Sequence, residues 1–588
     1  MKSHAASRRL KILAVVCLLS SAILLALLFL PYPILKSFLD GAMADGEFET
    51  LTPATALVIR LWFFLGAVLC IVLLGVSRSR ESSRIKRDRT GPAGLHRVWM
   101  EIKPRRDDVP WLLGLGLVVA VGLAFRLPRL MAGLNHDEAY TVMVFGRSLA
   151  FALTNYHVPN NHILHTVLVF LTTSLLGPAP WAVRLPALVT GLAALVAIYF
   201  VGSAAYSRAT GLGAAMLLAV ASAHITYSVK ARGYAPLALF TVLACWAAYC
   251  ALRRRKAWPW VLLAVAAALG AMTIPLMVYP YAVLMSWLLA EGMLADSGGA
   301  YRTKAEFLRF WLGSGLMCAL AVFALYTPAL MVTGPEAMVA IGRVAPAWTR
   351  TFLDSLQANA WQVVKDWAGG RSSLLTLLAG CGLVLSVLLH RRLTWTKVPM
   401  QLVFLAVGSA LVFVQRPNYG ARIWFSFLPL AALWTSAGTV GVVELLRIPG
   451  RRSFSLAAGI LTVGLAVAGA YALGAVRTFP ELWGRQGREE AVVLFLGKNL
   501  REGDWVVAPV LQVPVLRYYA RVHRVSQRPF DREGEARRLL LIAYPGEGQS
   551  AEVLLERVGL AGAIDPRSAE VLTEFKGAQI LEVQPPAP

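Results

Sequence analysis

The sequence predicts an α-helical protein that crosses a membrane many times and carries a small α/β domain after its last span. Of its 588 residues, 57% are hydrophobic. Apolar stretches of about 18 to 23 residues, the length that a membrane helix needs, recur along most of the chain. From about residue 478 onward, charged residues become more frequent and short apolar runs replace the long ones. These observations predict a polytopic membrane protein followed by a domain outside the bilayer.

The charge of the chain fits membrane orientation better than binding of nucleic acid. The formal net charge is +24, but Lys and Arg gather in short connectors between apolar stretches, as in cytoplasmic loops of membrane proteins. No basic domain with interleaved aromatic residues is recognisable, so nucleic acid is not an expected partner. The six cysteines lie within or at the ends of apolar stretches and lack the spacing of metal ligands. Neither a disulfide framework nor a zinc site is predicted.

The segment 1–108 predicts a hairpin of two spans with both ends in the cytoplasm. The basic start Lys2–Lys11 and the apolar run after it resemble a secretory signal. That run is long for a signal, and the nearest small-residue cleavage pattern lies well beyond it, which favours an uncleaved span. Spans near 12–32 and 56–76 therefore precede the strongly basic segment 78–106, which marks a cytoplasmic loop.

Counting spans from this loop assigns a side to every later connector. A span near 109–129 leaves the cytoplasm. If every later apolar stretch crossed, the basic run Arg253–Lys256 would lie outside, against the positive-inside rule. Agreement returns if 162–178 is an interfacial or re-entrant helix, and about thirteen spans then result, with the C-terminus outside. The spans after it are expected near 181–202, 210–228, 235–252, 258–273, 275–294, 309–331, 373–390, 399–415, 421–441 and 454–474.

The C-terminal part predicts a small external α/β domain. The runs 505–508 and 539–543 are short and apolar, as strands are, and helices are predicted over 488–500 and 549–558. No nucleotide-binding loop or catalytic motif is recognisable in it. The expected domains are an N-terminal hairpin with its basic cytoplasmic loop (1–108), a transmembrane catalytic domain (109–477) and this external domain (478–588).

Two adjacent carboxylates, Asp137 and Glu138, follow the span 109–129 closely. Ionised groups at a membrane boundary cost free energy, so they more often serve a functional site than a scaffold. A structural role is open as well, because Asn135 and Glu138 have the spacing of a capping box and Asp137 is favoured by the helix dipole. The two roles are compatible, since a capping Glu138 would hold Asp137 in a fixed direction.

Polar groups from other connectors are predicted on the same outer side. Each has a simpler explanation when taken singly, because Arg184 and Arg232 could reach lipid headgroups and Lys230 could anchor a helix at the interface. A carboxylate together with cations and imidazoles on one side is harder to explain without a site. The groups are His157, Asn160, Asn161, His162, His165, Arg184, His224, Tyr227, Lys230, Arg232 and Tyr234.

This set of groups suits the transfer of a sugar from a lipid-linked phosphosugar. The lipid leaves as a phosphate anion at the membrane boundary, where Arg or Lys can neutralise it. The acceptor hydroxyl needs a base near the anomeric carbon, and we assign that role to Asp137. Direct attack of the acceptor on the sugar carbon would invert its configuration.

At these residues the chain resembles the GT-C glycosyltransferases of the protein O-mannosyltransferase-like family, which includes the bacterial transferase that adds aminoarabinose to lipid A. The resemblance covers roughly residues 109–440, and the order and sidedness of its motifs carry it rather than any single motif. The matching pieces are Asp137-Glu138 with Tyr140, His157-Val158-Pro159, Arg184-Leu185-Pro186 and the turn from Tyr227 to Tyr234.

The resemblance implies a polyprenyl-phosphate sugar donor, an active site in the external loops and Asp137 as the base. Several relatives carry a second acidic residue close to the place where this chain has Arg232-Gly233-Tyr234. That departure weakens the case for a divalent metal held by both loops; such a metal stays open as a cofactor, but no metal ligand is predicted. The candidates are Asp137 and Glu138 for catalysis, Arg184, Arg232, His157, Lys230 and Arg422 for the donor phosphate, and Tyr140, His162 and Tyr234 elsewhere in the site.

The sequence thus predicts a GT-C-like inverting glycosyltransferase of the bacterial inner membrane, with a cytoplasmic N-terminus and a periplasmic C-terminus. It would pass a sugar from an undecaprenyl-phosphate-type donor to a lipid, glycan or protein acceptor on the periplasmic face. Two alternatives stay open. A transporter or flippase of lipid-linked glycans would favour charges in the middle of several spans, which are nearly free of them here. A non-catalytic GT-C-like scaffold would be expected to lack the carboxylate pair.

Overall fold

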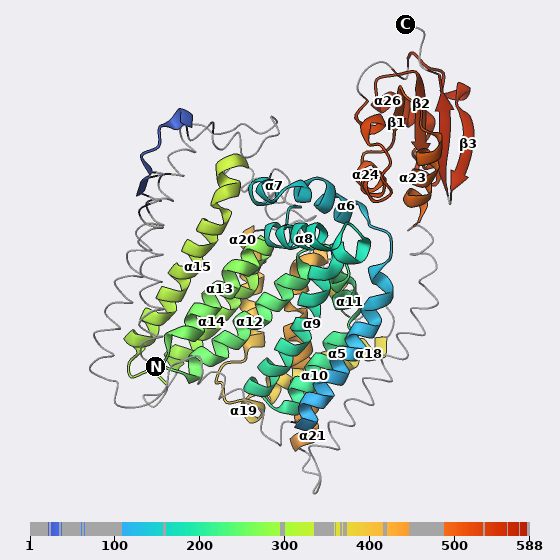
Figure 1. The fold of residues 1–588 in the computed structure, drawn as a ribbon. Helices are drawn as coiled ribbons and strands as arrows, with labels where there is room; N and C mark the ends of the chain where they lie inside the picture. The colour runs from blue at the N-terminus through green and yellow to red at the C-terminus, as the bar shows by residue number, and fades with distance from the viewer. Residues whose placement is uncertain are drawn as a thin grey trace, which may run out of the picture. The chain divides into compact units, whose positions relative to one another are not determined.

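The structure is a computed structural model (Figure 1), and the chain forms two units. One unit comprises Met1–Leu112, Leu153–Pro159 and Ala319–Gly342, and the other comprises Leu113–Ala152, Asn160–Cys318 and Arg343–Pro588. The described residues are 109–156, 160–294, 300–333, 373–415, 420–445, 487–532, 536–560, 562–575 and 577–584, with a few isolated ones between 22 and 64 and between 358 and 367. Only isolated residues of the predicted spans near 12–32 and 56–76 are described, and the predicted span near 454–474 lies outside the described residues.

The transmembrane part is built from apolar helices. The longer ones are α5 (Val109–Leu130), α9 (Pro180–Ala205), α10 (Arg208–Val220), α12 (Tyr234–Arg253), α13 (Ala257–Thr273), α14 (Val278–Leu294), α15 (Lys304–Thr333), α18 (Ser373–Leu388), α20 (Met400–Gln415) and α21 (Leu428–Leu445). The shorter ones are α6 (His136–Met143), η2 (Phe145–Arg147), α7 (Leu149–Thr154), α8 (Ile163–Leu176), α11 (Ser222–Ser228), η3 (Pro275–Met277), α19 (His390–Leu393) and η4 (Gly420–Phe427). The predicted fold class, a multi-pass helical membrane protein, is confirmed.

The predicted number of about thirteen spans is not confirmed. Within the described ranges, six helices are long and apolar enough to cross a membrane, or seven if the bent pair α10 and α11 forms one span. The helices α8, α13, α18 and α20 are apolar but shorter. A helix of 17 residues such as α13 measures about 25 Å, less than the hydrocarbon thickness of about 30 Å.

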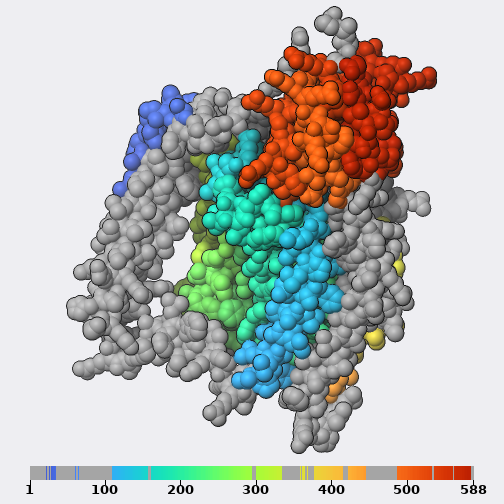
Figure 2. All heavy atoms as spheres, turned by 45° about the vertical axis from the view of Figure 1, so that its right-hand side comes forward, coloured from blue at the N-terminus to red at the C-terminus, as the bar shows by residue number. Residues whose placement is uncertain are grey.

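The helix α5 keeps an open apolar face. Only 33% of its most apolar 18-residue stretch is buried. Leu113, Leu117 and Leu127 are exposed along its length. Figure 2 shows α5 as a blue stripe on the surface. An apolar face of this length, left open in water, would be unfavourable, whereas contact with lipid tails accounts for it.

The helices α10 and α11 meet at a bend of 68°. A bend frees carbonyl groups in the last turn of the helix before it, and these need other donors. The fully buried Arg126 of α5 supplies one, because its Nη1 donates to the carbonyl of Ala219 at 3.2 Å. Its Nη2 lies 2.8 Å from Nδ1 of His224 in α11. Arg126 therefore braces the bend that leads the chain toward the turn before α12.

The helix α8 does not carry the chain to the other end of the long helices. Arg184, in the first turns of α9, binds the last two carbonyl groups of α5, so the end of α5 and the start of α9 lie together. His162, directly before α8, accepts a hydrogen bond from Gly233, directly before α12. Figure 1 shows α6 and α8 together at that same end. Both ends of α8 therefore lie at the same end of the long helices, in line with the charge count, and the non-crossing of this segment stays a prediction.

The C-terminal domain contains one four-stranded sheet in the order β1-β2-β4-β3. The pair β1 and β2 is parallel, and the other two pairs are antiparallel. The predicted strands and helices over 505–508, 539–543, 488–500 and 549–558 are confirmed, whereas the hairpin of β3 and β4 was not predicted. The elements are α23 (Arg488–Asn499), β1 (Asp504–Val507), α24 (Val513–Val522), α25 (Arg528–Asp531), β2 (Arg538–Ala543), η5 (Pro545–Glu547), α26 (Ala551–Arg557), η6 (Pro566–Ser568), β3 (Glu570–Phe575) and β4 (Ala578–Val583).

Close packing of α18 on α21 leads to a first prediction. A Cβ atom added to Gly438 would clash with the carbonyl oxygen of Gly382. Gly438→Ala should therefore force the two helices apart and lower the thermal midpoint in detergent, since overpacking costs about 1–3 kcal/mol. The matched control is Gly380→Ala in α18, where an added Cβ meets nothing within 4 Å. Equal midpoints for the two variants would contradict the described contact.

Candidate active site

The helix α6 begins with the capping box that the sequence predicts. The Asn135 side chain accepts a hydrogen bond of 3.0 Å from the backbone N–H of Glu138. The Glu138 side chain in turn accepts one of 3.1 Å from the backbone N–H of Asn135. Successive residues of a helix point about 100° apart. As a result, the Glu138 side chain is 1% exposed and the Asp137 side chain is 44% exposed.

The Glu138 carboxylate is saturated with donors. Its Oε1 accepts from Nε of Arg184 at 2.8 Å and from the backbone N–H of Ala231 at 2.9 Å. Its Oε2 accepts from Nη2 of Arg184 at 2.8 Å and from the Asn135 N–H. Burial would raise the pKa of Glu138, but the charge and hydrogen bonds of Arg184 and the two backbone N–H groups outweigh it, so this pKa is lowered. A saturated, ionised carboxylate is poorly suited to take up a proton.

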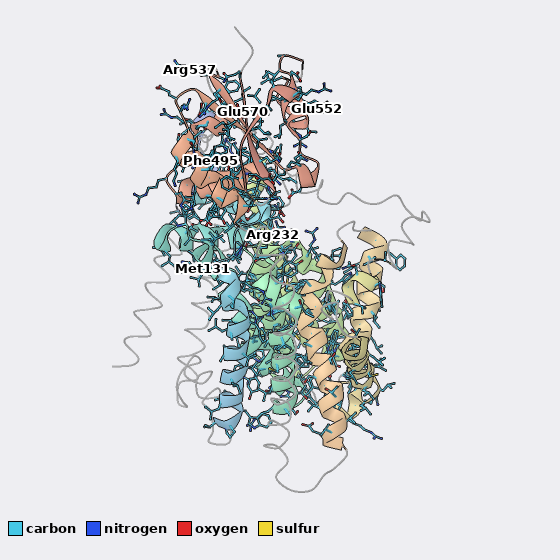
Figure 3. The ribbon with its side chains drawn as sticks, turned by 90° about the vertical axis from the view of Figure 1, so that its right-hand side faces the viewer. Met131, Arg232, Phe495, Arg537, Glu552 and Glu570 are labelled. Atoms are coloured by element: carbon cyan, nitrogen blue, oxygen red, sulfur yellow. The ribbon has the colours of Figure 1, made fainter. Side chains whose placement is uncertain are left out.

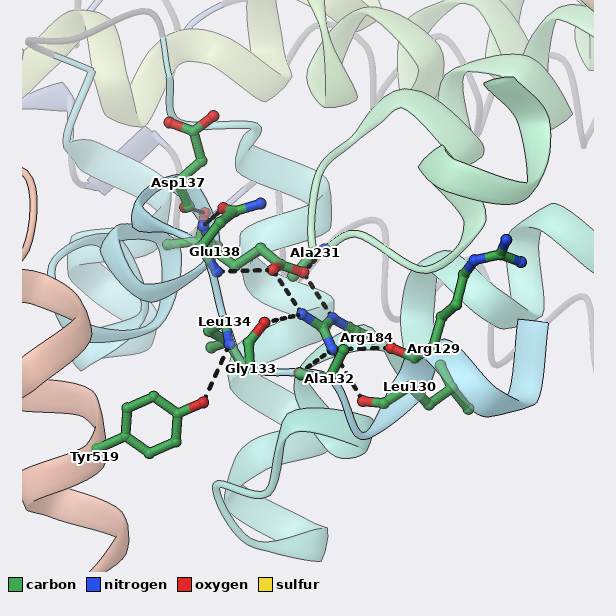
Figure 4. Close-up of polar contacts among 12 residues, drawn as sticks. Arg129, Leu130, Ala132, Gly133, Leu134, Asp137, Glu138, Arg184, Ala231 and Tyr519 are labelled. Carbon is green, nitrogen blue, oxygen red and sulfur yellow. Dashed lines mark hydrogen bonds and ion pairs between the residues drawn. The ribbon is translucent and has the colours of Figure 1, made fainter. Parts of the chain in front are cut away.

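Arg184 uses all five of its N–H groups within the protein (Figure 4). Two of them bind Glu138. The other three share four carbonyl groups, those of Arg129 and Leu130 at the end of α5 and those of Ala132 and Gly133 in the loop after it. Arg184 therefore joins α9 to the loop in front of α6. In this arrangement it has no donor left for a phosphate.

Asp137 points away from Glu138 and Arg184 (Figure 4) and has partners of its own. Its Oδ2 lies 3.0 Å from Nη1 of the buried Arg232, and its Oδ1 accepts a hydrogen bond of 3.3 Å from Nδ2 of Asn160. Figure 3 shows Arg232 at the same end of the helices as Met131, which follows α5. Asp137 is thus directed by two side chains and still open to solvent.

The turn that carries Lys230 and Arg232 is held on both sides. The backbone N–H of Ala231 donates to Glu138, and that of Gly233 donates to Nδ1 of His162 at 2.8 Å. Because Nδ1 accepts, the proton of His162 lies on Nε2. Burial, then Arg232 and His165, lower the pKa of His162 well below its ordinary value, so its ring is neutral. The turn that carries Lys230 and Arg232 is thus held by the saturated Glu138 carboxylate and by the neutral His162 ring.

Aromatic rings surround the two cations of this turn. The ring of Tyr227 lies 4.5 Å from that of Tyr234 and 4.5 Å from that of Phe425. Nζ of Lys230 lies 6.0 Å from the centre of the Tyr227 ring, and the Arg232 guanidinium lies 6.0 Å from that of Tyr234. Phe425 comes from η4, so this short helix reaches the site from a distant part of the sequence.

The structure brings most of the predicted site residues together. Asp137, Glu138, Arg184, Arg232, His162 and Tyr234 form a continuous chain of contacts. Tyr140 instead packs against the rings of His136 and Phe145. Arg422 is exposed near the start of η4, and His157 lies outside the described residues.

Two contributors have no individual role assigned from the sequence. Asn160 belongs to the polar groups predicted on the outer side, but its contact with Asp137 has no sequence signal. The backbone N–H of Ala231 belongs to an apolar residue, so no side-chain pattern could have revealed it. In the described part of the chain, no group of three or more His, Cys, Asp or Glu residues could hold a metal ion.

The segment that contains this turn matches a known family. Residues 161–303 match the model of the dolichyl-phosphate-mannose-protein mannosyltransferases, which confirms the predicted resemblance to membrane glycosyltransferases of this kind. No protein with a curated description matches the chain.

Several solved structures are similar to the chain. The oligosaccharyltransferase of Archaeoglobus fulgidus, in complex with Zn and sulfate, has 10% identity and a TM-score of 0.47, over 73% of this chain and 68% of that one. ArnT from Cupriavidus metallidurans, bound to undecaprenyl phosphate, has 12% identity and a TM-score of 0.34, over 79% and 97%. The arabinofuranosyltransferase AftD from Mycobacteria has 13% identity and a TM-score of 0.44, over 82% and 40%.

The buried pair of Glu138 and Arg184 leads to a second prediction. Glu138→Gln should lower the free energy of unfolding by about 3–5 kcal/mol at neutral pH, because it leaves a buried guanidinium without its counter-ion. The lowered pKa of Glu138 means that the pair stabilises the fold above the unfolded Glu value of about 4.3. This stabilisation fades as the pH falls through the lower folded value. Thermal unfolding of both proteins across this acidic range measures the difference.

The control for this variant is Glu306→Gln. Glu306 forms an exposed ion pair with Arg255, and solvent screens such a pair. We expect its midpoint at neutral pH to stay close to that of the wild type. A Glu138→Gln protein as stable as this control would contradict the role assigned to the buried pair.

Proposed function

We propose that this protein is an inverting glycosyltransferase that uses a polyprenyl-phosphate sugar of the undecaprenyl-phosphate type. It passes the sugar to a lipid, glycan or protein acceptor on the periplasmic face of the bacterial inner membrane. The observation that carries this proposal is the contrast between two adjacent carboxylates. Glu138 is buried and saturated, whereas Asp137 is exposed beside a buried arginine. The family match over residues 161–303 supports the transferase class.

In this proposal Asp137 is the general base. An acceptor hydroxyl that approaches its exposed side gives its proton to the carboxylate while its oxygen attacks the anomeric carbon. The bond between that carbon and the donor phosphate oxygen breaks, and the lipid phosphate leaves with the electron pair. Arg232 and Asn160 direct the carboxylate, and Glu138 holds the helix that carries it. Attack from the side opposite the phosphate inverts the anomeric centre.

The leaving phosphate needs fixed positive charge, and we propose Lys230 and Arg232 for this role. Both belong to the turn held by Glu138 and His162, so their charges are placed before the donor arrives. Arg184 was predicted for the same role, but all its donors are engaged, so we propose it as a positioning residue. Arg422 and His157 remain candidates for the same phosphate.

A third prediction concerns Asp137. Asp137→Asn keeps the size of the side chain but removes its ability to accept a proton, so transfer should slow by about 10²- to 10⁴-fold. The measurement is transfer from labelled polyprenyl-phosphate sugars in membranes with equal amounts of protein. Asp531→Asn, which changes an exposed ion pair in the C-terminal domain, is the matched control. Wild-type rates for Asp137→Asn would exclude it as the base. A flippase, the alternative, would move the lipid without forming a glycosidic bond.

A fourth prediction separates donor binding from proton transfer. Lys230→Ala should raise the KM for the polyprenyl-phosphate donor by about tenfold, because a charge-assisted contact with the phosphate is lost. The matched control is Lys256→Ala, just beyond the other end of α12. It should leave the KM unchanged. An equal KM for the two variants would remove Lys230 from the donor site.

A further inference from the structure

We propose that Tyr519, in the C-terminal domain, is a positioning residue for Asp137, which it directs through the loop in front of α6. This inference rests on the proposed function, since it takes Asp137 as the base. It gives the C-terminal domain a part in the transfer reaction, although that domain carries no recognisable catalytic motif.

The carrying contact joins two residues that are 385 positions apart. The backbone N–H of Leu134 donates a hydrogen bond of 3.2 Å to the hydroxyl oxygen of Tyr519 (Figure 4). Both residues are buried, with 5% and 4% of their surface exposed. A buried N–H without an acceptor is unfavourable, so this bond has a structural consequence despite its length.

This hydrogen bond completes the fixation of the loop. Arg184 holds the carbonyl groups of Ala132 and Gly133, and Glu138 holds the N–H of Asn135. The remaining N–H group between these points is that of Leu134, and it donates to the hydroxyl oxygen of Tyr519. The loop is thus held from α9 through its carbonyl groups and from the C-terminal domain through an N–H group. Asp137 follows three residues later.

The helix α24 places Tyr519 through apolar contacts. Its residues Leu516 and Tyr519 belong to one buried cluster with Leu134, Ala139 and Val142 of the α6 region, and α24 packs against α6. These α6 residues lie beside Asp137 in the sequence but are buried, whereas Asp137 is exposed.

Two more polar contacts join the same parts of the chain. The hydroxyl of Tyr518 donates to the carbonyl of Pro178 at 2.5 Å. Nδ1 of His136 lies 2.7 Å from the carbonyl of Leu511 and must donate to it. Burial raises the pKa of Tyr519 to about 12, so its hydroxyl stays neutral at physiological pH. The loop contact therefore persists over that whole range.

The reaction is sensitive to such a contact because a base must lie within hydrogen-bond reach of the proton that it takes. A displacement of about 1 Å by a distant substitution can lower a rate by about 100-fold. Loss of the Tyr519 acceptor would free the Leu134 N–H and loosen the start of α6. Donor binding at Lys230 and Arg232 would be affected less, since other contacts hold that turn.

The test is Tyr519→Phe in the full-length protein, which removes one oxygen and keeps the ring. We expect kcat to fall by about fivefold or more, with the KM for the polyprenyl-phosphate donor nearly unchanged. Hydrogen exchange in a peptide containing Leu134 should become faster. The matched control is Tyr544→Phe, whose buried ring lies in the same domain and whose hydroxyl has no hydrogen-bond partner in the described part of the chain. It should leave kcat and the exchange near Leu134 unchanged.

A double variant separates positioning from general stability. If Tyr519 acts through Asp137, Tyr519→Phe should not lower the residual rate of Asp137→Asn any further. An equal fractional loss in both backgrounds overturns the inference, as does an unchanged kcat or unchanged exchange at Leu134. If instead the proposed function itself is wrong, the wild type and Tyr544→Phe will transfer no sugar either. That result is distinguishable from failure of the inference about Tyr519.

Discussion

The buried ion pair between Glu138 and Arg184 is the interaction on which the site depends. Removing two charges from water costs several kcal/mol per ion, so the pair is tolerable only because every lone pair and N–H group is satisfied. Besides α6, which carries Glu138, the pair and the groups that satisfy it belong to three places: the end of α5 with the loop after it, the start of α9 and the turn before α12. The need to complete the pair therefore brings these three segments together.

This requirement also separates the roles of two neighbouring carboxylates. Because α6 turns about 100° per residue, Asp137 cannot share the environment of Glu138. It faces Arg232 and Asn160 and keeps 44% of its side chain exposed. The buried position of Glu138 and the exposed position of the proposed base thus come from one helical turn. The proposed general base is held rigidly without being buried itself.

The cations of the site are positioned by backbone contacts rather than by ion pairs alone. Arg126 braces the bend between α10 and α11, and beyond it Glu138 and His162 hold the N–H groups of Ala231 and Gly233. Lys230 and Arg232 consequently project from a fixed turn. The C-terminal domain contacts the loop in front of α6 through Tyr519, so distant parts of the chain support the small set of proposed site groups.

The sequence by itself determined the class of the protein, because long apolar stretches and the distribution of Lys and Arg are local properties. It also predicted the capping box at Asn135 and Glu138 and the first strands of the C-terminal domain, since these depend on short spacings. It could not show whether Arg184 has N–H groups free to bind a phosphate or uses all of them within the protein. It gave no sign of the contacts of Ala231 or Tyr519 with the α6 region. Those assignments depend on which groups meet across 46 to 385 residues, and only tertiary packing decides that, because burial determines which donors remain available.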